Sequence, residues 1–278
     1  LKKAMEAISN AKKPLLYIGG GAILSNCGYE IRDLAKKLNI PAVETLMARG
    51  VMGDENPLFF GMLGMHGEYA ANMAAHETDL LISLGARFDD RVTGRLDEFA
   101  SKAKVIHIDI DPTSIAKLVV ADYPIVGDLK LTVEAMIEDA DNYDINDFSN
   151  WVELLKDYRE KEPLRYIDTD DLIKPQWPIQ RVGKILGDNA IISTDVGQHQ
   201  MWTAQFFPFS HPRQWITSGG LGTMGFGLPA ALGAARAFKG TNRVVVNFTG
   251  DGSILMNIQE LMTCSEYELP VINIVLNN

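Results

Sequence analysis

The segment from Val244 to Asn278 constrains the fold most. An apolar run over residues 244–248 ends in Thr249-Gly250-Asp251-Gly252-Ser253, a helix-like stretch follows, and a second apolar run over 271–276 leads to Asn277-Asn278. This order predicts strand, glycine turn, helix and strand. Parallel strands joined by one helix carry their C-terminal ends to the same edge of a sheet, which is where open α/β folds bind ligands.

Asp251 and Asn278 should therefore face each other at that edge. A carboxylate and an amide oxygen are hard ligands that suit Mg²⁺ or Ca²⁺, and magnesium usually completes its shell with waters and substrate phosphates. Gly250 and Gly252 allow a phosphate close to the backbone. Gly-Asp-Gly alone, or Asn-Asn alone, is an ordinary turn sequence. Together, at this spacing, they favour a site for a divalent ion and a phosphorylated cofactor.

The order GDGS, helix, strand and NN resembles the diphosphate and metal motif of thiamine-diphosphate-dependent enzymes. In that family the aspartate, the second asparagine and a main-chain carbonyl two residues later bind the metal. Asp251 and Asn278 match the first two, and the third would be residue 280, beyond the chain. The resemblance implies that thiamine diphosphate is held through Mg²⁺.

Composition excludes several classes of function. With 278 residues, 46% of them apolar, the chain has room for two domains, and no apolar run is long enough for a membrane span. A net charge of −10 argues against a nucleic-acid partner. Two distant cysteines, Cys27 and Cys264, favour a reducing, cytoplasmic compartment, and the five histidines show no zinc spacing. We expect both ends of this sequence to lie within a longer chain.

Residues 1–140 alternate short apolar runs with helical periodicity, which predicts a doubly wound parallel sheet and a nucleotide-binding rim. The predicted strands are 15–18, 42–45, 80–84, 105–109 and 124–126, and the predicted helices are 28–38, 68–76, 112–120 and 130–139. Together with the C-terminal segment this gives an α/β protein with two doubly wound parallel-sheet domains.

Three stretches of this first domain have unusual composition. Gly19-Gly20-Gly21 is not the dinucleotide fingerprint, because Leu24 occupies the third glycine position, and it favours close packing over phosphate binding. Residues 85–94 place two arginines and two aspartates after a buried strand, which suits a pyrophosphate or ribose contact or a solvated loop. Residues 61–67, with three glycines, predict a loop laid against something flat and apolar.

Residues 141–171 are rich in acidic and amide side chains and predict an acidic linker with one short helix at 151–158 and no function. Residues 172–278 form the second predicted domain. Its strand at 190–193 leads into 194–202, where Gln198 and His199 are positioned to meet a diphosphate. A second interpretation, which can hold together with the first, is that Thr194 or Asp195 caps a helix there. The glycine-rich loop at 218–229 suits backbone packed against a ligand.

The string Val196-Gly197-Gln198-His199-Gln200-Met201-Trp202 resembles that of acetohydroxyacid synthases (acetolactate synthases), and the resemblance extends over the whole chain. In that family the central domain binds FAD across the strand ends, and an apolar side chain, here Met224, supports the bent thiamine cofactor. The implied thiamine diphosphate contacts are Val196, Gln198, His199, Gly222, Met224, Gly250, Asp251, Gly252, Ser253 and Asn278. The implied FAD contacts are Gly19, Gly20, Gly21, Thr45, Leu46, Met47, Leu63, Gly64, Met65, His66, Gly85, Ala86, Arg87, Asp89, Arg91, Val92, Asp109, Ile110 and Asp128.

The resemblance implies decarboxylating condensation of pyruvate with pyruvate or 2-ketobutyrate, in a homodimer or tetramer with a separate regulatory subunit. The family's catalytic glutamate lies in a pyrimidine-binding domain outside this sequence, so we expect no catalytic residue here and no activity of this piece alone. Two alternatives stay open. One is a related flavin enzyme such as pyruvate oxidase or glyoxylate carboligase, and the other is a non-catalytic nucleotide-binding module.

Overall fold

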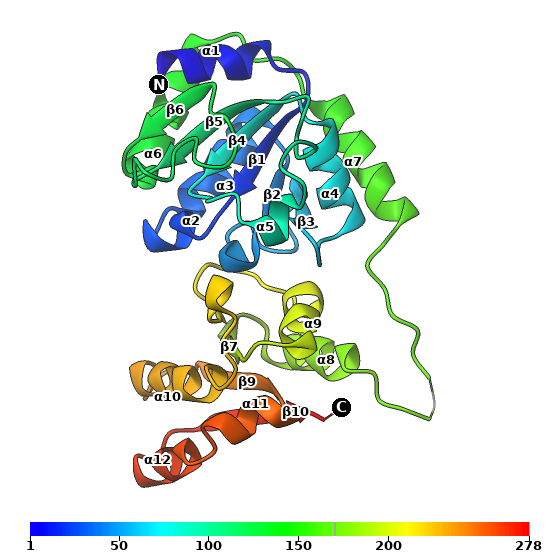
Figure 1. Ribbon diagram of the computed structural model, residues 1–278, viewed down its shortest axis with the longest axis vertical. Helices are drawn as coiled ribbons and strands as arrows, with labels where there is room; N and C mark the ends of the chain where they lie inside the picture. Colours follow the sequence, from blue (N-terminus) through cyan, green and yellow to red (C-terminus); the bar gives the residue numbers. More distant parts are fainter. Residues whose placement is uncertain (170, 278) are drawn as a thin grey trace. The chain divides into compact units, whose positions relative to one another are not determined.

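The computed structural model describes residues 1–169 and 171–277. The chain divides into two compact units, Leu1–Leu164 and Arg165–Asn278. Each contains a sheet of parallel strands with flanking helices (Figure 1), which confirms the predicted α/β class. None of the helices within the described ranges combines the length and the hydropathy that a membrane span requires.

The first sheet has the strand order of a dinucleotide-binding fold. Its strands are β1 (Pro14–Ile18), β2 (Ala42–Glu44), β3 (Phe59–Met62), β4 (Leu80–Leu84), β5 (Lys104–Asp109) and β6 (Tyr123–Val126). They are all parallel and run in the order β3-β2-β1-β4-β5-β6. The order reverses between β1 and β4, and a crevice at such a reversal is where doubly wound sheets bind their ligands.

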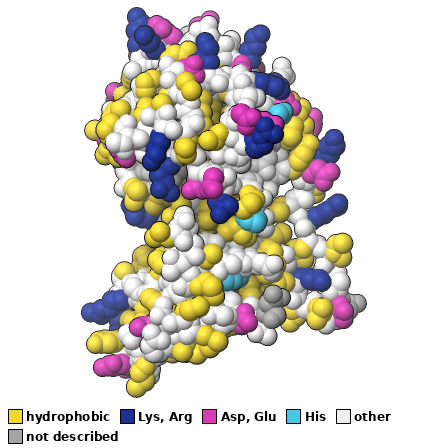
Figure 2. All heavy atoms as spheres, viewed as in Figure 1, with side chains coloured by type: hydrophobic (Ala, Val, Ile, Leu, Met, Phe, Trp, Pro, Cys, Tyr) yellow, Lys and Arg dark blue, Asp and Glu magenta, His cyan; other side chains and the backbone are white. Residues whose placement is uncertain are grey.

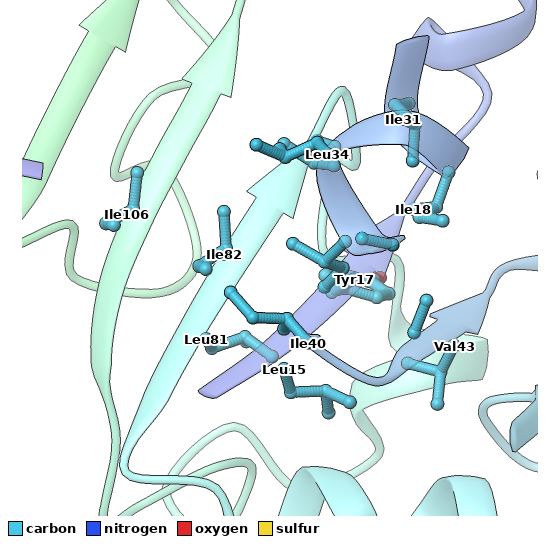
Figure 3. Packing of buried hydrophobic residues seen from close by; sticks show 14 of the residues in the cluster. Leu15, Tyr17, Ile18, Ile31, Leu34, Ile40, Val43, Leu81, Ile82 and Ile106 are labelled. Atoms are coloured by element: carbon cyan, nitrogen blue, oxygen red, sulfur yellow. The ribbon is translucent and has the colours of Figure 1, made fainter. Parts of the chain in front are cut away.

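Helices cover this sheet: α1 (Lys2–Asn10), α2 (Gly21–Leu24), α3 (Gly28–Leu38), α4 (Tyr69–Glu77), α5 (Asp90–Thr93), α6 (Leu129–Asp139) and α7 (Ser149–Lys161). Helix α3 shows why they form: Ile31 and Leu34 lie on one apolar face, and Asn39 ends the helix in a left-handed conformation. Figure 3 shows this face packed over the sheet, with Leu15, Tyr17, Leu81 and Ile82 among the buried side chains.

Two predictions for this unit were wrong. Residues 112–120 form turns instead of a helix, because the Asp111 carboxylate accepts hydrogen bonds from the Thr113 amide and hydroxyl, both at 2.8 Å, and so competes with helical pairing. The predicted loop at 61–67 begins inside a strand, since Gly61 and Met62 belong to β3. Gly61 has φ +103°, and the Glu68 carboxylate occupies the space that a Cβ would need.

Helix α7 lies in the predicted linker yet packs on the first unit. Trp151, Val152 and Leu155 are buried in its core, and Trp151 Nε1 donates a hydrogen bond to the Pro14 carbonyl at 3.0 Å. The first compact unit therefore ends at Leu164 and not at the predicted residue 140. The sequence concealed this because the buried side chains of α7 stand among many charges.

The second sheet has four parallel strands in the order β10-β9-β7-β8. They are β7 (Ala190–Thr194), β8 (Trp215–Ile216), β9 (Val244–Gly250) and β10 (Val271–Leu276). The helices of this unit are α8 (Gln176–Leu186), α9 (Gln198–Phe206), α10 (Gly227–Ala237), α11 (Asp251–Met256) and α12 (Glu260–Glu266). The strand order reverses between β7 and β9, which makes the C-terminal ends of these two strands the expected ligand edge.

Candidate functional site

The buried carboxylate of Asp195 joins three segments at this edge. Asp195 is 0% exposed and directly follows β7. Its Oδ2 accepts a hydrogen bond from Thr249 Oγ1 at 2.5 Å, and its Oδ1 accepts one from the Gly227 amide at 2.7 Å. The ends of β7 and β9 and the start of α10 are thus fixed to one another. The prediction of site residues missed this role, although an aspartate directly after an apolar strand was a visible signal.

His199 presents an unsatisfied polar atom at the same edge. Its side chain is 6% exposed, and its Nε2 has no hydrogen-bond partner among the described residues. Burial lowers the pKa of His199, although the neighbouring Asp195 carboxylate opposes this shift. Burial therefore favours the neutral ring. A buried donor or acceptor without a partner is rare in folded proteins and fits a polar ligand.

Two glycines make room for the His199 ring. A Cβ on Gly250 would lie 3.1 Å from Nδ1, and a Cβ on Gly197 would lie 2.8 Å from Cε1. Helix α9 begins at Gln198 with Gly197 as its N-cap, so neither Thr194 nor Asp195 caps it, and that interpretation was wrong. Gln198 itself is exposed at the first position of the helix.

The glycine-rich loop approaches the same edge. Gly222 and Gly225 have φ +63° and +78°, and Asn257 Nδ2 holds the loop by donating to the Gly225 carbonyl at 2.6 Å. A Cβ on Gly252 would lie 3.5 Å from Met224 Cε, and one on Gly222 would lie 3.9 Å from Val196 Cγ1. Four of the predicted contacts are thus neighbours in two pairs: Val196 lies beside Gly222, and Met224 lies beside Gly252. Met224 is 44% exposed and so available to a ligand.

The predicted metal ligands follow two paired strands. In the register of β9 and β10, Gly250 is opposite Leu276, so Asp251 and Asn277 come next at the same edge. Asp251 is exposed, Ser253 is buried in α11, and Asn278 lies outside the described residues. Within those residues there is no group of three or more His, Cys, Asp or Glu side chains that could hold a metal. One carboxylate supplemented by phosphates and waters is nevertheless a donor set that suits Mg²⁺.

In the first unit, the glycine triplet lies at the reversal between β1 and β4. A Cβ on Gly19 would come within 2.3 Å of the Gly85 carbonyl oxygen, and one on Gly21 within 2.7 Å of Gly85 Cα. Gly20 lies beside Met47, whose Cβ would be 3.1 Å from an added Cβ. Gly19 and Gly21 are therefore required for the close packing of two loops, the role that the sequence favoured.

The remaining predicted FAD contacts also follow strand ends of the first sheet. Thr45, Leu46 and Met47 come after β2, and Leu63–His66 come after β3. The Met65 amide donates to the Arg91 carbonyl at 2.8 Å, which joins the loop after β3 to helix α5, the element that follows β4. Asp89 and Asp128 cap α5 and α6. Gly85, Ala86, Arg87, Val92, Asp109 and Ile110 complete the set, with Ala86 buried and Ile110 70% exposed.

The two units correspond to two described protein domains. Residues 1–136 match "Thiamine pyrophosphate enzyme, central domain", and residues 195–278 match "Thiamine pyrophosphate enzyme, C-terminal TPP binding domain". The chain belongs to the thiamine pyrophosphate enzyme family.

Within that family, the chain is similar over its full length to acetolactate synthase large subunits. It is 45% identical to the acetolactate synthase isozyme 3 large subunit of Escherichia coli, 46% identical to the acetolactate synthase large subunit of Haemophilus influenzae, and 45% identical to the acetolactate synthase of Mycobacterium bovis. It covers 49%, 49% and 45% of those proteins, so it spans about half the length of these curated relatives.

Proposed function

We propose that the second unit binds the diphosphate of thiamine diphosphate at the reversal between β7 and β9. The observation that carries this proposal is the unpaired Nε2 of buried His199, whose ring lies with its Nδ1 and Cε1 atoms against Gly250 at that edge. An imidazole nitrogen, close-packed glycines and an exposed Asp251 carboxylate are the groups that a diphosphate and its magnesium ion require.

In this proposal, Gly250, Gly252, Ser253, Gln198 and His199 surround the diphosphate. Asp251 and Asn278 bind Mg²⁺, and Val196, Gly222 and Met224 contact the rest of the cofactor. When bound, thiamine diphosphate supplies the electron sink for decarboxylation of a 2-keto acid. The residues of this chain bind and orient it.

We propose FAD as the ligand of the first unit. Three features support it: the strand order of β3-β2-β1-β4-β5-β6, the close-packed glycines at its reversal, and the loops that follow β2, β3 and β4 at one edge. In the acetohydroxyacid synthases that the chain resembles, the flavin undergoes no net oxidation or reduction. A non-catalytic nucleotide-binding module would share the same strand order, so an experiment has to distinguish it from a flavin-binding domain.

For the whole protein we propose the decarboxylating condensation of pyruvate with pyruvate or 2-ketobutyrate, which belongs to branched-chain amino acid biosynthesis. The names of the relatives support it over pyruvate oxidase or glyoxylate carboligase. The term "large subunit" in those names supports a separate regulatory subunit, and we also propose a homodimer or tetramer in the cytoplasm. The 278-residue piece alone should produce no steady acetolactate.

Calorimetric titration of the purified chain with thiamine diphosphate, with and without Mg²⁺, tests the first proposal. Asp251→Asn and Asn278→Ala should each weaken the magnesium-dependent binding about tenfold or more, which is the loss of one strong charged contact. Glu266→Gln at the exposed end of α12 is the control and should bind like the wild type. Binding that ignores Mg²⁺ and Asp251 would refute the assignment.

A separate titration with FAD, followed by flavin fluorescence, tests the first unit. Saturable quenching supports a flavin site. If ADP binds as tightly as FAD and thiamine diphosphate does not bind the second unit, a nucleotide-binding module becomes the better reading.

A further inference from the structure

The first unit contains a fully buried ion pair. Charged side chains are scattered over the surface in Figure 2, as expected from the cost of removing charge from water. Glu44 and Arg49 are exceptions, with 0% and 2% of their surface exposed. A buried charge is tolerated only where hydrogen-bonding or charged partners compensate it. The partners of the Glu44–Arg49 pair therefore identify the segments that the pair holds in place.

The partners of this pair are the backbone and one carboxylate of a single loop. Glu44 Oε2 accepts hydrogen bonds from Arg49 Nη1 at 3.0 Å and from the Gly50 amide at 3.1 Å, and Oε1 accepts one from the Met52 amide at 2.5 Å. Arg49 Nη2 donates to both oxygens of Asp54, at 2.8 and 2.9 Å. The loop that leaves β2 is thus folded around the Arg49 side chain.

The first residue of β3 and the residue that follows this strand are both connected to the same pair. The Leu63 amide donates to the Glu44 carbonyl at 2.9 Å, and the Arg49 guanidinium lies over the Phe59 ring, 5.2 Å from its centroid. Glu68 accepts a hydrogen bond from the Met62 amide at 3.3 Å. From α7, Arg159 donates to the Phe59 carbonyl and stacks on Phe60. The helix predicted to be a functionless linker therefore also contacts β3, at its first two residues.

Glu44 and Arg49 flank the segment Thr45–Met47 in the chain, and Glu44 is bonded to the start of Leu63–His66, so the network borders two of the segments assigned to the ligand rim. We propose that the Glu44–Arg49–Asp54 network is a positioning device that fixes the conformation of this rim. The proposal deepens the flavin assignment and rests on it for the identity of the ligand. The planar guanidinium of arginine fixes the directions of its hydrogen bonds, which apolar packing does not do. It therefore determines the geometry of the loop as well as its stability.

Two variants separate positioning from simple stability. Arg49→Lys keeps the positive charge but loses the guanidinium group that bonds Glu44 and Asp54 at the same time. The double variant Glu44→Gln/Arg49→Met removes both charges of the buried pair, and the Asp54 carboxylate that loses its guanidinium partner is 26% exposed and can be hydrated. Arg95→Lys is the control, because Arg95 forms its ion pairs with Asp97 and Glu98 on the surface.

The readouts are hydrogen exchange of the Gly50, Met52 and Leu63 amides, the dissociation constant for FAD and the thermal midpoint. We expect Arg49→Lys and the double variant to exchange these amides about tenfold faster or more and to bind FAD about tenfold more weakly, equivalent to one charge-assisted hydrogen bond. The double variant should keep a thermal midpoint close to wild type, and Arg95→Lys should change nothing.

Wild-type exchange rates in both variants would overturn the positioning role, whatever the FAD result. Faster exchange with unchanged FAD affinity would overturn it as well, because the rim would then bind without being fixed. If the wild-type chain does not bind FAD, the flavin assignment fails, and the exchange rates alone decide whether the network orders the rim.

Discussion

Thr249 Oγ1 donates a 2.5 Å hydrogen bond to Asp195 Oδ2 across the two strands at which the order of the second sheet reverses. The other oxygen of Asp195 accepts the Gly227 amide, so one buried carboxylate sets the spacing between the segments that contain His199, Gly250 and the glycine-rich loop. The geometry of the proposed diphosphate site thus depends on a residue that need not touch the cofactor.

Asp195→Ala should destabilise the second unit by about 2–4 kcal/mol, because it leaves the Thr249 hydroxyl and the Gly227 amide buried without an acceptor. Asp195→Asn keeps one acceptor oxygen and should cost about 1 kcal/mol. Urea unfolding measures both. Asp188→Ala, on an exposed side chain, is the control and should stay within about 0.5 kcal/mol of wild type. Equal stability of Asp195→Ala and wild type would contradict the account.

His199→Phe should separate ligand binding from stability. The ring still fills the space beside Gly250 and Gly197 and the unsatisfied Nε2 disappears, but the hydrogen bond of the ring to the Asp195 backbone is lost, so the free energy of unfolding should stay within about 1 kcal/mol of wild type. Affinity for thiamine diphosphate should fall about tenfold or more, since the nitrogen proposed to contact the diphosphate is gone. Calorimetric titration measures it, with His76→Phe in α4 as the control. Undiminished affinity in His199→Phe would remove His199 from the site.

Much of this arrangement follows from local sequence. Apolar runs followed by glycine, aspartate or asparagine predicted the strands β7, β9 and β10, and parallel pairing then brings Asp251 and the end of β10 to one edge. The proximity of His199 to Gly250 has the same origin, since β7 and β9 are neighbours.

Contacts between distant side chains could not be predicted in this way. The residues around Asn257 do not indicate that its side-chain amide donates to the Gly225 carbonyl. From the sequence alone Glu44 would be assigned to the surface, whereas in the structure its carboxylate accepts hydrogen bonds from three donors. Strand β3 was missed because Gly61 weakens the strand pattern, while the need for glycine comes from Glu68, which lies seven positions later. Sequence patterns specify elements and edges, whereas the partners of buried polar groups depend on the assembled fold.

His107 should make the stability of the first unit fall in mild acid. Burial lowers its pKa below the ordinary value of 6.5, although the hydrogen bond between Nε2 and the Ala86 carbonyl, at 3.1 Å, and nearby Asp109 oppose this. The unfolded chain binds a proton below that value while the folded chain does not, so stability is complete above about pH 6.5 and falls as the pH drops below it. His107→Gln should flatten this dependence in urea titrations at several pH values. Ser83→Ala, at the paired position on β4, should retain it.

Two glycines in helices of the second unit should respond oppositely to the same substitution. Gly183 in α8 is buried, and a Cβ there would lie 2.3 Å from Pro208 Cδ, so Gly183→Ala must displace the proline ring and should destabilise the unit by about 1–3 kcal/mol. Gly233 in α10 is exposed with nothing within 4 Å of an added Cβ, so Gly233→Ala should stabilise it by about 0.5–1 kcal/mol through helix propensity. Thermal unfolding of the two variants checks the sign directly. Because each variant adds one methyl group to a helix, stabilisation of both variants would mean that the close contact between α8 and Pro208 does not exist in solution.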